Sequence, residues 1–183
     1  MGKLRDVCKD EVQKMNQSLI FGDEVEFVSH VEIDEGLFGK KRKNNKGNVY
    51  KKQWVFGITQ RSSNKVFFQL VDKRTKTVLL PLITKYISKS AILHHDDWPA
   101  YRKLSQLGYK DVVVKHCKGF KGPTGACTNT IEGLWGVMKQ RIIRMHGIEI
   151  SKLDSYLCEY TYRYFHRQNM LDALIHDLSI NNA

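Results

Sequence analysis

The sequence is poor in cysteine and has no long apolar run, and each shortage excludes a class of protein. Four cysteines occur among 183 residues, and no two of them form a C-x-x-C pair. This usage favours a reducing compartment, cytosol or nucleus, over a disulfide-stapled secreted fold. No apolar run approaches the ~20 residues that cross a bilayer, and no apolar signal segment follows the N-terminus. A zinc site built from Cys117, Cys127 and a nearby histidine stays open as an alternative, although the paired spacing of zinc ligands is missing.

Acidic residues are also scarce relative to basic ones. The chain has 19 Asp and Glu residues against 30 Lys and Arg residues, which gives a net charge of +11 and a pI near 9.5. This balance favours a polyanionic partner, with nucleic acid as the first candidate. The alternative is a basic protein with no such partner. The length is sufficient for one domain with a substantial core.

Seven of the basic residues form one run between Lys40 and Lys52 that contains no acid. Like charges this dense cannot pack against one another, so the run is predicted to be an exposed loop or hairpin tip. A glycine-rich basic loop follows at residues 118 to 127. We expect these segments to contact DNA phosphates; for the first run, a solvated loop and a nuclear-localisation signal are the alternatives. The candidate DNA-binding residues are Lys40, Lys41, Arg42, Lys43, Lys46, Lys51, Lys52, Lys118 and Lys121.

The spacing of apolar residues predicts a single α/β domain. Strands are predicted over residues 28–35, 53–61, 65–71, 91–95 and 111–116. Helices are predicted over residues 4–20, 75–87, 98–107, 130–146 and 151–168, with one weak helix in the tail. This order indicates an antiparallel hairpin region that is extended by parallel strands and covered by helices. We expect residues 1–27 to be a helical remnant of an upstream region, residues 28–168 to be the domain, and residues 169–183 to be a tail.

Three acidic residues far apart in the sequence have settings that could bring them together. Asp34 and Asp96 each stand at the end of a predicted strand, and Glu132 lies near the start of a predicted helix. Side chains in such places can converge on one pair of divalent cations. Hard oxygen ligands suit Mg²⁺ or Mn²⁺, and two such ions activate an attacking oxygen and stabilise a leaving one in phosphodiester chemistry.

Simpler structural roles compete with this interpretation. Asn129 and Glu132 fit a capping box, with Asn129 at the N-cap and Glu132 three residues into the helix. Asp97 could replace Asp96 as a ligand, or could cap the helix that follows it.

The neighbours of Asp34 are a further alternative. Glu32 shares the strand face of Asp34 and could replace it as a ligand, whereas Glu35 points to the opposite face. The tryptophans Trp98 and Trp135 are predicted to be core residues, and the strand histidines His94, His95 and His116 are predicted to be satisfied by their neighbours.

Five stretches in this order resemble the catalytic domain of DDE transposases, and most closely the Merlin superfamily and its bacterial insertion-sequence (ISXO-like) relatives. The resemblance covers roughly residues 28 to 166. The matching stretches are Val31-Glu32-Ile33-Asp34-Glu35, Phe38-Gly39-Lys40, Gln53-Trp54-Val55-Phe56-Gly57, Asp96-Asp97-Trp98-Pro99-Ala100-Tyr101, and Thr128-Asn129-Thr130-Ile131-Glu132-Gly133-Leu134-Trp135 with Lys139.

The resemblance implies a ribonuclease-H-like fold, an α/β fold whose mixed five-stranded sheet has helices on both faces. It implies that Asp34, Asp96 and Glu132 hold two Mg²⁺ or Mn²⁺ ions, and that Lys139 is the basic residue that relatives carry after the glutamate. The implied reaction is DNA strand cleavage followed by strand transfer. The implied partners are transposon ends, target DNA and further copies of the chain, in the nucleus of a eukaryotic host and otherwise in the cytoplasm.

Two positions depart from the pattern of the relatives. Asp97 stands where relatives usually have glycine, and Cys127 stands where they usually have histidine. Relatives also carry an N-terminal DNA-binding region, which we expect this chain to lack. An inactive or repurposed DNA-binding protein derived from a transposase therefore remains an alternative, as does a ribonuclease-H-like nuclease that acts on RNA.

Overall fold

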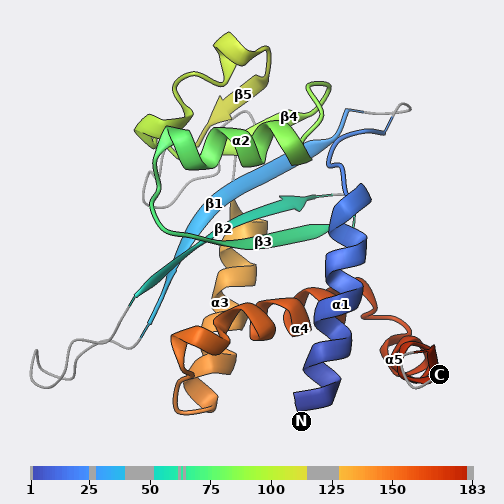
Figure 1. Cartoon of the computed structure of the whole chain (residues 1–183). Coiled ribbons are helices and arrows are strands. Elements are labelled where there is room, and N and C mark those ends of the chain that lie inside the picture. Colours follow the sequence, from blue (N-terminus) through green and yellow to red (C-terminus); the bar gives the residue numbers. More distant parts are fainter. Residues whose placement is uncertain are drawn as a thin grey trace, which may run out of the picture.

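A mixed sheet of five strands organises the chain, in the order β3-β2-β1-β4-β5 (Figure 1). The structure, a computed structural model, describes residues 2–24, 28–39, 52–61, 63, 65–114 and 128–180. The first three strands are antiparallel neighbours, and β4 and β5 continue the sheet parallel to β1. The strands are β1 (His30–Phe38), β2 (Gln53–Gln60), β3 (Val66–Val71), β4 (Ile92–His95) and β5 (Lys110–Val113).

Helices cover both faces of this sheet (Figure 1). One face carries α2, and the other carries α3 and α4, while α1 packs against α4 and α5 against α1. The helices are α1 (Gly2–Ser18), α2 (Lys76–Tyr86), α3 (Asn129–Arg144), α4 (Leu153–Phe165) and α5 (Met170–Ile180). This strand order, with helices on both faces, is that of the ribonuclease-H-like fold, so the predicted fold class is confirmed.

Alternation along β1 divides its side chains between two cores. Val31 and Ile33 are fully buried against the α2 face, in the larger cluster of apolar residues. The residues that alternate with them along the strand face α3, and at the end of the strand Phe38 packs edge-on to Trp135 with ring centroids 5.8 Å apart. That contact accounts for a strand that runs beyond the predicted end at residue 35.

One predicted helix is wrong. Residues 98–107 form two short 3₁₀ helices, Pro99–Tyr101 and Ser105–Leu107, rather than one α-helix. Tyr101 and Leu104 are both buried, and their three-residue spacing matches the tighter 3₁₀ turn. Successive i→i+3 hydrogen bonds hold this segment, such as the one from the Leu104 N–H to the Tyr101 carbonyl. Packing of these two side chains therefore overrides the α-helical preference.

The N-terminal segment packs into the sheet domain. Phe21 is fully buried in the main core and forms an isolated parallel bridge with Ile87. Upstream of it, α1 pairs with α4 through a salt bridge of 3.0 Å between Lys9 and Asp154. The predicted boundary at residue 27 remains a prediction. In the part of the chain that the structure describes, no helix is both long enough and apolar enough to span a bilayer.

Candidate active site

Asp34 lies in the middle of the sheet, opposite Gly57 of β2. Its Oδ2 accepts a hydrogen bond of 3.0 Å from the indole Nε1–H of Trp135 on α3. The ring lies so close to the sheet that a Cβ added to Gly57 would be 2.6 Å from its Cζ2, and one added to Gly36 would be 3.0 Å from its Cδ2. The two glycines therefore make the space in which Trp135 reaches Asp34. Trp135 is a core residue as predicted, and it also orients the carboxylate.

Asp96 comes directly after β4, at a strand end as predicted, whereas Asp34 lies inside β1 and not at its end. Glu32 of β1 pairs in parallel with His94 of β4, so each aspartate follows one member of a matched pair by two residues. Asp96 is half-buried, and its Oδ1 accepts a hydrogen bond of 3.2 Å from the Trp98 backbone N–H. Neighbouring parallel strands thus bring the two aspartates to adjacent places.

Glu132 occupies the first turn of α3, on the face of the sheet toward which the Asp34 side chain points. The side chain is exposed, and its Oε1 accepts a hydrogen bond of 2.8 Å from the Thr128 hydroxyl. The predicted capping box is wrong: α3 begins at Asn129, with Thr128 as its N-cap.

Electrostatics link the three carboxylates. Burial raises the pKa of Asp34 most, and the charges of Asp96 and Glu132 raise it further. Hydrogen bonds from the Glu35 backbone and from Trp135 oppose that rise. The charges of Asp96 and Glu132 thus both act on the Asp34 carboxylate.

The donor set suits Mg²⁺ or Mn²⁺ in its chemistry, because it consists of carboxylate oxygens that repel one another. Among the described residues, however, no group of three or more His, Cys, Asp or Glu side chains lies close enough to hold one ion as the side chains stand. Side-chain rotations would have to bring the three carboxylates together around an ion.

Glu32 has a structural task instead of the ligand role that its strand face allows. Its side chain is fully buried and accepts a hydrogen bond of 2.7 Å from Arg61. It also accepts 3.0 Å hydrogen bonds from the Thr130 hydroxyl and from the Ile131 backbone N–H. Because the first N–H groups of a helix lack partners within the helix, Glu32 caps α3 from across the fold.

Glu35 lies on the opposite face, as the alternation predicts. Its carboxylate accepts hydrogen bonds from the Tyr101 hydroxyl and, at 3.3 Å, from Arg74. Burial, aided by the charge of Asp34, raises the pKa of Glu35 to about 8, while Arg74 opposes the rise.

His94 is satisfied at one nitrogen only. Its Nε2 lies 2.8 Å from Nδ1 of His30, but its buried Nδ1 has no hydrogen-bond partner within the described ranges. Burial lowers the pKa of His94 to about 4, aided by the charge of Arg61, so the ring is neutral at pH 7. The prediction that neighbours satisfy the strand histidines is thus only partly right for His94.

Three further candidate residues are exposed. Asp97 is exposed, and the side-chain contact to the following turn comes from Asp96 instead. Lys139 is exposed on α3, with its Nζ 5.5 Å from the centroid of the Phe38 ring. Lys52 is exposed just before β2. The other candidate residues and the possible zinc ligands lie outside the described residues: Lys40, Lys41, Arg42, Lys43, Lys46, Lys51, His116, Cys117, Lys118, Lys121 and Cys127.

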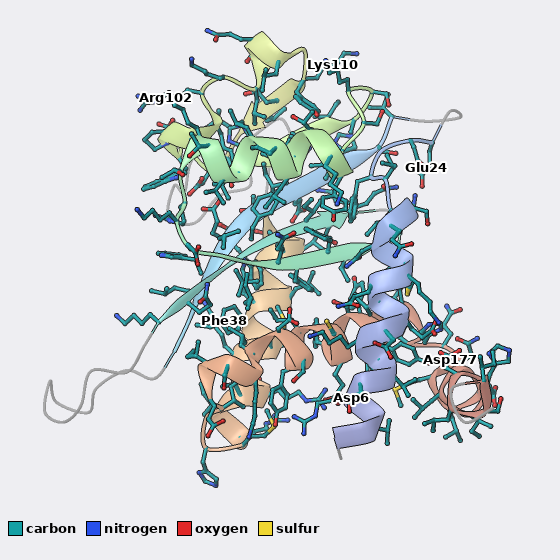
Figure 2. The ribbon with its side chains drawn as sticks, viewed as in Figure 1. Asp6, Glu24, Phe38, Arg102, Lys110 and Asp177 are labelled. Atoms are coloured by element: carbon teal, nitrogen blue, oxygen red, sulfur yellow. The ribbon has the colours of Figure 1, made fainter. Side chains whose placement is uncertain are left out.

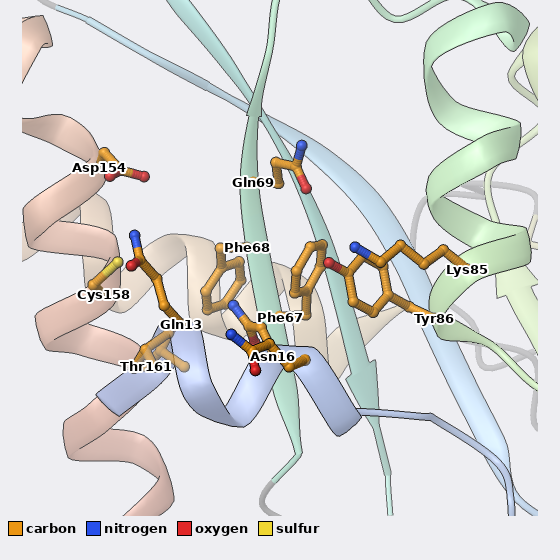
Figure 3. Close-up of a pocket in the computed structure, with 12 residues that line it drawn as sticks. Gln13, Asn16, Phe67, Phe68, Gln69, Lys85, Tyr86, Asp154, Cys158 and Thr161 are labelled. Atoms are coloured by element: carbon orange, nitrogen blue, oxygen red, sulfur yellow. The ribbon is translucent and has the colours of Figure 1, made fainter. Parts of the chain in front are cut away.

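A separate cavity of about 280 Å³ lies between α1, β3 and α4 (Figure 3). Amide and aromatic side chains line it, among them Gln13, Asn16, Phe67 and Tyr86. None of the three carboxylates contributes to its wall, so it is distinct from the candidate active site.

Comparisons with known proteins bear on the family of the chain. No curated protein matches the chain. A crystal structure of a pre-cleavage Mos1 transpososome resembles it at 10% sequence identity and a TM-score of 0.35, over 97% of this chain and 62% of that chain. The chain thus spans less than two thirds of the length of that relative. The family model of the ISXO2-like transposase domain matches residues 27–164, which include all three carboxylates and Lys139, and the chain therefore belongs to this transposase family.

Proposed function

We propose that this chain carries out the chemistry of DNA transposition. The reaction is metal-dependent cleavage of a DNA phosphodiester by water, followed by attack of the freed 3′-hydroxyl on target DNA. The observation that carries the proposal is the parallel pairing of Glu32 with His94, which puts Asp34 and Asp96 at matched positions two residues on. Glu132 is near enough for its charge to raise the pKa of Asp34.

Each residue has a distinct part in this proposal. Asp34 and Asp96 hold the metal ions, and Glu132 completes the second site. Two Mg²⁺ or Mn²⁺ ions, when bound, supply activation of the attacking oxygen and stabilisation of the leaving one. Trp135 fixes one oxygen of Asp34 by its 3.0 Å hydrogen bond. Lys139 binds a phosphate beside the carboxylates.

DNA is the partner that the charge of the chain supports. The net charge of +11 favours the polyanion, and the run from Lys40 to Lys52 with Lys118 and Lys121 would hold its phosphates. Joining two transposon ends requires at least two active sites, so the proposal includes an assembly of two or more copies on DNA.

The test is cleavage of supercoiled plasmid and of short duplex DNA in Mg²⁺, in Mn²⁺ and in a chelator. Wild type is expected to nick DNA only with a divalent ion. Asp34→Asn, Asp96→Asn and Glu132→Gln are each expected to lower the rate by orders of magnitude, because each removes a charge that offsets the cation. Asp172→Asn is the control, since Asp172 is an exposed carboxylate on α5 that is not part of the proposed site. Equal cleavage by wild type and Glu132→Gln would refute the assignment of the three carboxylates.

A non-catalytic DNA-binding protein is the second candidate, and the two departures from the family pattern favour it. Asp97 and Cys127 replace the usual glycine and histidine of the relatives. If wild type binds DNA and never cleaves it, Cys127→His is the next variant to test. Restored cleavage would trace the loss to that position, and continued inactivity would support the binder. Preferential cleavage of an RNA–DNA hybrid would instead indicate a nuclease acting on RNA.

A further inference from the structure

The sheet ladder ends just before Asp96. The last interstrand hydrogen bond at this edge runs from the Val114 N–H to the His95 carbonyl, at 2.7 Å. Strand pairing alone therefore does not fix Asp96 against Asp34. The residues that follow Asp96 in sequence supply the missing contacts, and they make them on the far face of the sheet.

A cluster of five side chains there, which we call the Arg74 clamp, joins the segment after Asp96 to β1. Its members are Trp54, Arg74, Trp98, Tyr101 and Glu35. The Arg74 guanidinium lies between two indole rings, 4.2 Å from the centroid of Trp54 and 3.8 Å from that of Trp98. The Trp98 indole Nε1–H also donates a 2.9 Å hydrogen bond to the Arg74 carbonyl.

The clamp reaches both aspartates through their neighbours. Glu35 follows Asp34 directly, and it accepts hydrogen bonds from Arg74 and from the Tyr101 hydroxyl. Trp98 donates its backbone N–H to the Asp96 carboxylate at 3.2 Å. A movement of Trp98 or of Glu35 would therefore displace one carboxylate relative to the other.

We propose that Arg74 is a positioning residue, which holds Asp96 beside Asp34 in the geometry that divalent cations need. This inference rests on the proposed function, because it assigns a task to Arg74 only if the two aspartates share metal ions. Arginine suits the task because its planar guanidinium can stack between two rings and donate to a carboxylate at once, which lysine cannot do. Residues that orient the ligands of a metal typically change its affinity 10- to 100-fold when they are replaced.

The test compares Arg74→Lys with wild type in Mn²⁺ binding by calorimetry, in DNA affinity and in the rate of DNA cleavage. Lysine keeps the charge and loses the planar stack. We expect Mn²⁺ affinity to fall by about 10-fold or more, the cleavage rate to fall with it, and DNA affinity to stay unchanged. Arg102→Lys is the matched control, because Arg102 projects from the surface beyond α2 (Figure 2). A purely structural role for Arg74 would lower the amount of folded protein and leave the Mn²⁺ affinity of that folded protein unchanged.

Tyr101→Phe is the second variant, and it tests the positioning role if Arg74→Lys does not fold. It removes only the hydroxyl that donates to Glu35, and the buried ring stays in place. Its expected result is the same loss of Mn²⁺ affinity. Wild-type affinity in both folded variants would overturn the positioning role and leave the proposed function standing. Absence of Mn²⁺ binding by wild type would overturn the proposed function itself, and the inference with it.

Discussion

At the scale of single residues, the side chain of Trp135 both packs in the core and orients a candidate metal ligand. The indole fills the space above two glycines and directs its N–H to Asp34. A glycine inside a strand often marks a close approach of another group, so Gly57 is the signal in the sequence that could have revealed this contact. The hydrogen bond itself spans 101 positions in the chain, and no local pattern indicates it.

Gly57→Ala tests this arrangement. The new Cβ would lie 2.6 Å from Trp135 Cζ2 and 2.7 Å from Cη2, so the indole must move away from Asp34. We expect the free energy of unfolding to fall by about 1–3 kcal/mol, the range for an overpacked core, and DNA cleavage to weaken as well. Unfolding in urea measures the first effect.

Gly136→Ala is the matched control on α3. A Cβ there meets nothing within 4 Å, and alanine in a helix interior is better than glycine by about 0.5–1 kcal/mol. The control is expected to be slightly more stable than wild type. Equal stability of Gly57→Ala and wild type would show that the indole does not lie where the structure places it.

Glu32 and Glu132 both contact the start of α3, and we expect variants of the two to differ: one should affect stability and the other catalysis. Glu32→Gln removes the buried partner of Arg61, and loss of one member of a buried ion pair costs about 3–5 kcal/mol. Glu132→Gln keeps an oxygen for the Thr128 hydroxyl and should cost less than about 1 kcal/mol. We expect the first variant to be unstable and the second to be folded, able to bind DNA and unable to cleave it.

Urea unfolding and DNA cleavage, measured on both variants, test these two expectations. The result that contradicts the assignment is the reverse one, with a stable Glu32→Gln and an unstable Glu132→Gln. In that case Glu132, rather than Glu32, would hold the start of α3.

At the scale of elements, sequence periodicity predicts helices and strands, and it misses contacts between residues that are far apart in sequence. Apolar spacing correctly predicts all five strands and helices α1 to α4 to within a few residues, because each buries one regular face. Alternation also places Glu32 and Glu35 on their correct faces. The predicted capping box at the start of α3 is wrong, because the Ile131 N–H binds Glu32 of β1, 99 positions away. Residues 98–107 were misassigned because Tyr101 and Leu104 are held by the core.

Two cysteines can be used to test the contact between α1 and α4. Cys8 and Cys158 are free thiols in this contact, and burial raises their pKa to about 11 and about 12. A raised pKa lowers the fraction of the reactive thiolate at pH 8. We expect both to react with iodoacetamide much more slowly in the native protein than in urea, as followed by peptide mass spectrometry. Rapid labelling of Cys8 in the native protein would show that α1 does not stay docked on α4.

At the scale of the whole molecule, the two faces of the sheet carry different groups of side chains. Asp34 and the first turn of α3, with Glu132, lie on one face, and the larger core and the Arg74 clamp lie on the other. An acidic site in a chain of net charge +11 needs basic residues nearby to attract a polyanion. The run that begins at Lys40 follows β1 closely in sequence, and we expect it to supply that positive charge.

Replacing Lys40, Lys41, Arg42 and Lys43 with glutamine tests this arrangement. Each phosphate contact that is lost should lower the slope of log K against log salt by about 0.9, so four contacts would lower it by about 3.6. We expect weaker binding to every DNA sequence and a flatter salt dependence, measured by fluorescence anisotropy over a range of salt concentrations. The matched control removes the same charge from exposed lysines around α2, at Lys73, Lys76, Lys89 and Lys103. An equal loss in both variants would mean that net charge alone attracts DNA, and an unchanged slope in the first would assign the run to a solvated loop or a localisation signal. A loss confined to the first variant would instead show that the run itself contacts DNA phosphates.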